Sequence, residues 1–317
     1  MTLTTYKRFV FLFAFILLCG HLAGVSAQLG GLGGLGDKLK KKTPNLLGDK
    51  QPITTSLPDA KWGDSSKDGF TPREAQRSLM TLQRTPNGGF VLQPGYYTLQ
   101  VQSYCLKAGT HGPGGGNGYL YAPPKGPAED AVMTIVRNSV NRPEIPQSKI
   151  QVLLWAIIAR AKFEDLAPEI KVTASQLLTP RQLAGLNRSA LDAIPSQALN
   201  QLPSGVRQVL QAEAQLRQML TSTTATFAEM ERVAVLSGNA PLGEDSIDIP
   251  SGRWSIHPDG YYVRYIPSSY SSTRVEIWVP QGSPAVGKEF DPATHIAVPG
   301  NTARQRLIQS GRPQQSQ

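Results

Sequence analysis

The hydrophobic pattern changes its period twice along the chain, and this limits the fold more than any other feature of the sequence. Between residues 88 and 105, Tyr97, Leu99 and Val101 alternate with polar neighbours, as in a half-buried strand. From about residue 129 to residue 235 the apolar spacing is helical, and from Ser251 the period returns to two. The pattern predicts an α+β protein: a strand-rich region that bears Cys105, packed with a helical domain and followed by a small antiparallel β-meander.

The same changes divide the chain into five predicted segments. They are a signal peptide (residues 1–27), a flexible leader (residues 28–70), an α+β region with a helical extension (residues 71–240), a small antiparallel sheet (residues 245–283) and an extended or disordered tail (residues 284–317). The leader contains a Leu-Gly-Gly repeat, a lysine run and little apolar surface to bury. Thr71, followed by proline, predicts the start of a short helix that ends at Leu82.

The amino terminus has the features of a secretory signal. Lys7 and Arg8 precede the apolar run of residues 9–19, and Ala27 ends a cleavage site of small residues. The run is too short to span a bilayer permanently, so we expect no transmembrane segment after its removal. Cys19 allows lipid attachment as an alternative, although Leu18 stands where such signals have a small residue. The expected location is secreted or at the cell surface, with the periplasm or outer envelope as variants.

The chain is basic, which bears on its partners. Its formal net charge is +9 and falls to +7 when Lys7 and Arg8 are removed with the signal. Such a charge suits contact with anionic surfaces, but it also serves solubility alone. No long basic patch with interleaved aromatic residues occurs, so we expect no nucleic-acid partner. His257 and His295 lack metal-ligand spacing, so we expect no metal and no cofactor. The oligomeric state stays open.

Removal of the signal leaves Cys105 as the only cysteine. An exported protein can form disulfides, but one cysteine cannot form an intramolecular one. Its thiol is a buried inert group, half of an intermolecular disulfide, a catalytic nucleophile, or one end of another cross-link. The strand alternation places Cys105 on the apolar face, where it can be shielded from water.

Two short motifs connect Cys105 with a glutamine. Tyr104-Cys105 resembles the aromatic-Cys motif, and the sequence from Ile150 to Trp155 resembles the apolar-Gln-x-x-apolar-Trp motif, of the thioester domains on Gram-positive surface adhesins. The similarity is confined to about residues 96–163. The resemblance implies an internal thioester between Cys105 and Gln151 that reacts with an amine on a protein or surface and attaches the cell covalently. It implies a self-processed reactive group rather than an enzyme with turnover.

A thioester persists only where water is excluded, so the site needs apolar walls. The aromatic residues that we expect to form this supporting pocket are Tyr104, Tyr119, Tyr121 and Trp155. Gln151 falls in the first turn of an apolar helix, and Trp155 lies one turn further on the same face. Trp155 is therefore placed to cover the cross-link.

Two other functions stay open. A non-enzymatic envelope scaffold or binding protein with an inert buried Cys105 accounts for the same residues. A cysteine-dependent hydrolase needs a base, for which His111, six residues after Cys105, is the candidate.

The aromatic residues of the carboxy-terminal meander either present a platform for sugar or cover the core of the small sheet. They are Tyr261, Tyr262, Tyr265, Tyr270 and Trp278.

Overall fold

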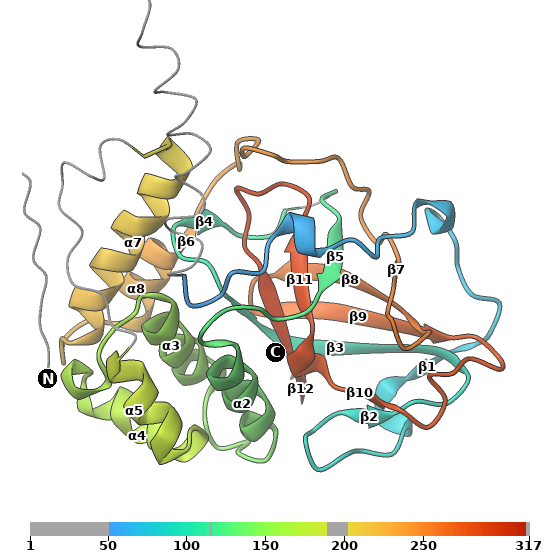
Figure 1. Cartoon of the computed structure of the whole chain (residues 1–317), viewed down its shortest axis with the longest axis horizontal. Coiled ribbons are helices and arrows are strands. Elements are labelled where there is room, and N and C mark those ends of the chain that lie inside the picture. Colours follow the sequence, from blue (N-terminus) through green and yellow to red (C-terminus); the bar gives the residue numbers. More distant parts are fainter. Residues whose placement is uncertain (1–50, 115, 189–201, 315–317) are drawn as a thin grey trace, which may run out of the picture. The chain divides into compact units, whose positions relative to one another are not determined.

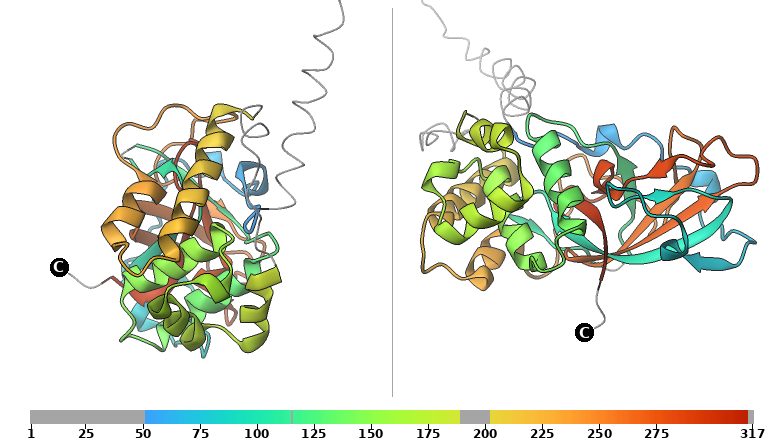
Figure 2. Two further views of the ribbon diagram at one scale, coloured as in Figure 1. Left: turned by 90° about the vertical axis from the view of Figure 1, so that its left-hand side faces the viewer. Right: turned by 90° about the horizontal axis from the view of Figure 1, so that it is seen from below.

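The computed structural model describes residues 51–114, 116–188 and 202–314, which all belong to one compact unit. The predicted signal peptide and residues 28–50 of the predicted leader lie outside the described residues. Figures 1 and 2 show a twisted sheet with the helices gathered beside one end of it. The α+β class predicted from the sequence is confirmed.

The strands and helices follow the order that the change of period predicts: strands first, then helices, then strands again. The strands are β1 (Gln76–Ser78), β2 (Phe90–Val91), β3 (Gly95–Cys105), β4 (Thr110–His111), β5 (Tyr119–Ala122), β6 (Val235–Leu236), β7 (Ser255–Ile256), β8 (Tyr262–Ser269), β9 (Ser272–Val279), β10 (Glu289–Phe290), β11 (Ile296–Pro299) and β12 (Leu307–Pro313). The described α-helices are α2 (Glu129–Val140), α3 (Gln147–Ile158), α4 (Pro168–Leu177), α5 (Pro180–Arg188), α7 (Ser204–Leu220) and α8 (Phe227–Ala234).

The main sheet has the strand order β5-β11-β12-β3-β9-β8-β7, and β1 pairs in parallel with the first part of β3. Strand β3 therefore lies inside the sheet, with β9 on one edge and β12 on the other. The meander predicted for residues 245–283 is part of this sheet, because β9 pairs with β3 along eight residues, from Gly95 to Gln102.

The predicted extended or disordered tail is wrong for residues 284–314. Strands β11 and β12 from this segment lie between β5 and β3, and the red strands of Figure 1 show this insertion. Leu307 and Ile308 are fully buried. Ser310 of β12 has a partner inside the fold, since its Oγ donates to the carbonyl of Gln102 at 3.1 Å. Partners from elsewhere in the fold stabilise a strand whose composition alone predicts none.

Order also begins earlier than predicted. Ile53 is 4% exposed, and Trp62 packs on Tyr121 with ring centroids 5.3 Å apart, so residues 51–70 are not a flexible leader. The helix expected from Thr71 to Leu82 is absent; the structure has β1 and a 3-10 turn, Leu79–Thr81, in its place. Pairing with β3 favours the extended backbone there.

Helix α3 is the central helix of the described domain. Every residue from Ile150 to Ile158 is buried, and α3 contacts α2, α4, α7, α8 and the sheet strand β3. An all-round apolar helix is stable only when it is enclosed in this way. The enclosure fixes α3 against the end of β3. In the described part of the chain, no helix is both long and apolar enough to cross a membrane.

Candidate functional site

Cys105 is the last residue of β3, at a point where the neighbouring strand β9 has ended. Strand β9 pairs with β3 only as far as Gln102, and Ser103 then donates its N–H to the carbonyl of Ser271 at 3.0 Å. On the other edge, Leu307 of β12 lies opposite Cys105. Alternate residues of an antiparallel ladder direct their N–H and C=O to the same edge, so those of Cys105 point where β9 is missing. Both groups need partners because Cys105 is fully buried.

The side-chain carboxamide of Gln151 supplies both partners. Cys105 donates its N–H to Oε1 of Gln151 at 2.9 Å, and Nε2 of Gln151 donates to the carbonyl of Cys105 at 3.1 Å. The carboxamide thus takes the place of the peptide group that a longer β9 would present. One helical turn earlier, Nε2 of Gln147 donates to the carbonyls of Ser103 at 3.1 Å and Ser271 at 2.7 Å. Two glutamines on one face of α3 therefore fasten the helix to the end of β3.

The sulfur of Cys105 is held by Trp155, one turn after Gln151. The indole Nε1–H of Trp155 donates to Sγ at 3.1 Å, and Trp155 is fully buried. Phe227, the first residue of α8, stacks on the indole with ring centroids 5.4 Å apart and an interplanar angle of 22°. Helix α8 begins at a capping box formed by Thr226 and Glu229, which fixes where Phe227 lies. The two stacked rings keep water from the sulfur on this side.

Burial raises the pKa of the Cys105 thiol to about 12, although the hydrogen bond from Trp155 opposes this shift. The thiol therefore keeps its proton at neutral pH. A hydrolase that uses cysteine needs the opposite shift, towards the thiolate. In the described part of the chain, the side chains that act on this thiol are Trp155 and Glu231, and His111 is not among them.

Tyr270 and Glu231 form a pair near the sulfur. The hydroxyl of Tyr270 donates to Oε1 of Glu231, and both side chains are half-buried. Tyr270 lies in the turn between β8 and β9, where its carbonyl accepts a hydrogen bond from Ser103 Oγ at 3.0 Å. Burial and the Glu231 carboxylate raise the pKa of Tyr270, so its phenol stays protonated. The charge of Glu231 also raises the pKa of Cys105, which places this carboxylate in the surroundings of the thiol.

The three tyrosines expected to wall the site lie elsewhere. Tyr104 precedes Cys105 in β3, so its side chain projects from the opposite face and donates to Oε1 of Gln102 at 3.1 Å. Tyr119 and Tyr121 lie in β5, which β11 and β12 separate from β3. At about 4.8 Å per strand, this separation is about 14 Å. This part of the prediction is wrong because the tail of the chain inserts two strands between β5 and β3.

Tyr121 belongs to a second aromatic cluster, together with His257, Tyr261, Phe290 and His295. The rings of His257 and His295 stack with centroids 5.1 Å apart, and the hydroxyl of Tyr261 lies 2.7 Å from Nε2 of His295. Burial lowers the pKa of His257 to about 4 and that of His295 to about 3, so both rings are neutral at pH 7. Among the described residues, no three His, Cys, Asp or Glu side chains are arranged to hold a metal ion.

The aromatic residues of the carboxy-terminal strands do not form a single platform. Tyr261 and Tyr265 are each 1% exposed and belong to the core. Tyr262 stacks instead on Trp278, with centroids 5.0 Å apart, while Tyr270 faces Glu231. The alternation of the strands separates these rings between the two faces of the sheet.

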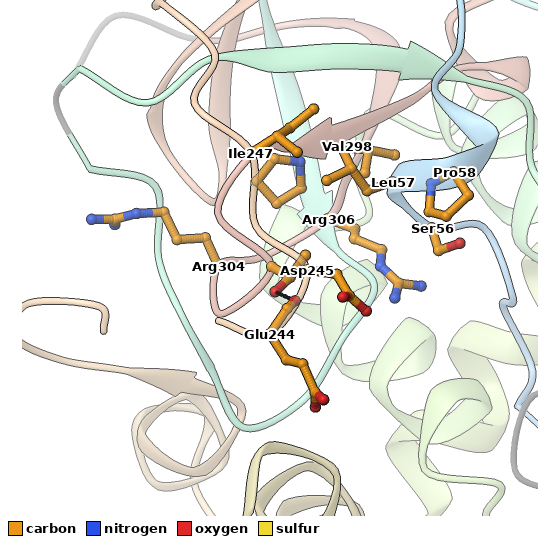
Figure 3. Close-up of a pocket in the computed structure, with 11 residues that line it drawn as sticks. Ser56, Leu57, Pro58, Glu244, Asp245, Ile247, Val298, Arg304 and Arg306 are labelled. Carbon is orange, nitrogen blue, oxygen red and sulfur yellow. Dashed lines mark hydrogen bonds between the residues drawn. The ribbon is translucent and has the colours of Figure 1, made fainter. Parts of the chain in front are cut away.

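A cavity of about 490 Å³ lies away from Cys105. It is lined by Ser56, Leu57, Pro58, Glu244, Asp245, Ile247, Val298, Pro299, Thr302, Arg304 and Arg306. Figure 3 shows Arg306 extending between Ser56 and Asp245, while Arg304 points away from the other labelled side chains. Arg306 directly precedes β12, whose first residue, Leu307, is the partner of Cys105. Successive residues of an extended chain point to opposite faces, so the cavity and the thiol lie on opposite faces of the sheet.

No known protein family matches this chain. Comparisons with curated proteins and with solved structures also found no match. The similarity to adhesin thioester domains therefore depends on the motif residues around Cys105 and Gln151, and the function has to be argued from the geometry that these residues adopt.

Sequence reasoning missed three residues of the site: Phe227, Glu231 and Tyr270. They follow Cys105 by more than a hundred residues, and no spacing within the chain links them to it. One local signal was present, since Thr226 and Glu229 have the spacing of a capping box. That signal predicts where α8 begins, and the four-residue spacing then puts Phe227 and Glu231 on one helix face.

Proposed function

We propose that Cys105 and Gln151 form an internal thioester, through which this protein, exported to the cell surface, attaches covalently to amine-bearing targets. The observation that carries the proposal is the pairing of the Gln151 carboxamide with both backbone groups of Cys105, beside a thiol that Trp155 holds. These hydrogen bonds hold the thiol and the carboxamide next to each other, and the residues that carry them, Cys105 and Gln151, are 0% and 2% exposed. Enforced proximity of this kind is the main requirement for the reaction.

The hydrogen bonds favour the chemistry of thioester formation. Sγ of Cys105 attacks Cδ of Gln151, the new C–S bond forms, the C–N bond breaks, and the thiol proton leaves with the nitrogen as ammonia. The N–H of Cys105 donates to Oε1, the oxygen on which negative charge develops during the attack. The bond from Nε2 to the Cys105 carbonyl holds the leaving group in one orientation.

The mass of the intact mature chain tests this proposal. We expect the purified protein to be lighter than its sequence by one ammonia, and methylamine to add one amine at Gln151. The Cys105→Ala and Gln151→Glu variants should both have their full sequence mass and take up no amine, because one lacks the nucleophile and the other lacks the amide leaving group. A wild-type chain of full mass with a free thiol that titrates on unfolding contradicts the proposal.

Replacing Trp155 by phenylalanine should make the thioester sensitive to water. The variant keeps an aromatic ring against Phe227 but loses the indole N–H that holds Sγ, and it leaves space at a fully buried position. We expect spontaneous hydrolysis to be about tenfold faster, measured as the gain of one water in intact mass over time. A neighbouring apolar substitution outside the site, Val152→Ala, serves as the control. Equal hydrolysis rates in both variants contradict a shielding role for the indole.

One observation favours an alternative, a non-covalent envelope scaffold in which Cys105 is inert. The Gln151 carboxamide completes the hydrogen bonding at the end of β3, and this structural role requires no covalent bond. Gln147 plays such a role one turn earlier without any cysteine. The same mass measurement separates the two functions, because a scaffold retains the nitrogen of Gln151.

A further inference from the structure

The side chains around Cys105 contact one another in a continuous series. One of them, Glu231, has no part in thioester formation as described above. Trp155 binds the sulfur and stacks on Phe227 of α8. Glu231 lies four residues after Phe227, hence on the same helix face, and accepts the hydrogen bond from Tyr270. The turn that carries Tyr270 is bonded to Ser103, two residues before Cys105 in β3. Glu231 is thus fixed at the site from both α8 and the sheet.

We propose that Glu231 is the general base of the amine reaction, held in position by Tyr270, and that it receives the target as a primary ammonium ion. This inference rests on the proposed function. Glu231 is half-buried, in contrast to the buried Cys105, Gln151 and Trp155, so an amine in solution can reach its carboxylate. A carboxylate at that position attracts an alkyl ammonium, and the protonated phenol of Tyr270 keeps one carboxylate oxygen in place while the other is left for the ligand.

The proposed step balances as follows. The ammonium gives a proton to the Glu231 carboxylate, and the neutral amine attacks Cδ of the Gln151 thioester. The C–S bond breaks as the C–N bond forms, and the proton of the attacking nitrogen passes to the departing sulfur. The products are an amide at Gln151, a thiol at Cys105 and a protonated Glu231, which returns its proton to water. An alkyl amine at neutral pH is almost wholly protonated, so removal of this proton is required before attack.

Two amines that differ in protonation test the inference on the mature full-length chain. Methylamine is mostly protonated at pH 7 and needs the base, whereas methoxyamine is mostly neutral and does not. We expect Glu231→Gln to slow the reaction with methylamine about 100-fold and to change the reaction with methoxyamine by less than about threefold. Tyr270→Phe keeps the ring but frees the carboxylate, so it should slow methylamine about tenfold with the same selectivity. Rates are followed by intact mass.

Glu229→Gln is the matched control, since Glu229 lies on the same helix, is exposed, and keeps its capping role as glutamine. It should leave both rates unchanged. Equal slowing of methylamine and methoxyamine in Glu231→Gln overturns the inference, because it indicates that Glu231 has a structural role and is not a base. An unchanged methylamine rate also overturns it. If Glu231→Gln does not fold, the same comparison is made with Glu231→Asp. Equal effects on both amines in that variant also contradict the role of Glu231 as a base. A wild-type chain without the loss of ammonia defeats the proposed function itself, whereas a thioester without the selective effect defeats only the role of Glu231.

Discussion

Replacing Glu213 by alanine should lower the free energy of unfolding by about 3–5 kcal/mol. Glu213 of α7 forms an ion pair with Arg160, just after α3, and the two side chains are only 6% and 2% exposed. Removal of the carboxylate leaves the guanidinium in the interior without this counter-charge, and the cost of keeping such a charge from water is large. Arg160 also has a left-handed backbone, with φ of 57°, at the end of α3, so its side chain has little freedom to move to solvent.

Urea unfolding of the purified mature chain measures this effect as a lower midpoint at an unchanged slope. Glu213→Gln keeps the volume and an acceptor oxygen, so we expect it to cost clearly less than the alanine variant. The double variant Arg160→Met, Glu213→Leu should be more stable than Glu213→Ala, because neither charge then remains buried. If Glu213→Ala unfolds at the same urea concentration as the wild type, the ion pair does not contribute to stability in this way. The result bears on the site, since α3 carries both Gln151 and Trp155.

Acidification from pH 7 to pH 4 should lower the free energy of unfolding by about 6 kcal/mol through His257 and His295. Burial lowers the pKa of these histidines to about 4 and about 3, whereas an unfolded histidine titrates near pH 6.5. The unfolded chain therefore binds more protons, and stability is complete above about pH 6.5 and is lost as the pH falls towards the folded pKa values. Each tenfold difference in proton affinity contributes about 1.4 kcal/mol.

The groups that face the two histidines explain why they stay neutral. Asp259 favours protonation of His257, but burial and the charge of Lys288 oppose it, and His257 in turn opposes protonation of His295. Urea unfolding between pH 7 and pH 4 should show a steep decline in the wild type. His295→Gln should be less stable at pH 7 but show a shallower decline, and the exposed-site control Arg232→Gln should follow the wild type. A wild-type stability that is flat over this range contradicts the expectation.

The class of fold could be predicted because the hydrophobic period is a local property. The alternation that ends at Cys105 corresponds to β3, and the apolar run from Ile150 corresponds to the buried part of α3. The spacing of Gln151 and Trp155 placed them on one helix face, and this face lies against Cys105. These features depend on neighbours within a few residues, which the sequence displays directly.

The position of β12 could not be predicted, for a physical reason. Its residues include Gln309, Ser310, Gly311 and Arg312, a composition typical of exposed chain. Several of their polar groups have partners within the fold, since Gln309 Nε2 donates to the carbonyl of Leu307 and Arg312 donates to the carbonyl of Ile145. Interactions between distant segments thus outweigh local propensity. The misplaced tyrosines of β5 follow from the same error, because β11 and β12 separate that strand from Cys105.

The place of β12 has a consequence for when the sulfur becomes protected. The ribosome makes β3 and α3 long before residues 307–313, yet Leu307 is the residue that lies across from Cys105. Until β12 is made, Cys105 therefore lacks the strand that borders it on this edge of β3. The enclosure of the thiol in the sheet thus depends on a segment that is synthesised more than 140 residues after Gln151, and β3 and α3 alone do not complete its surroundings.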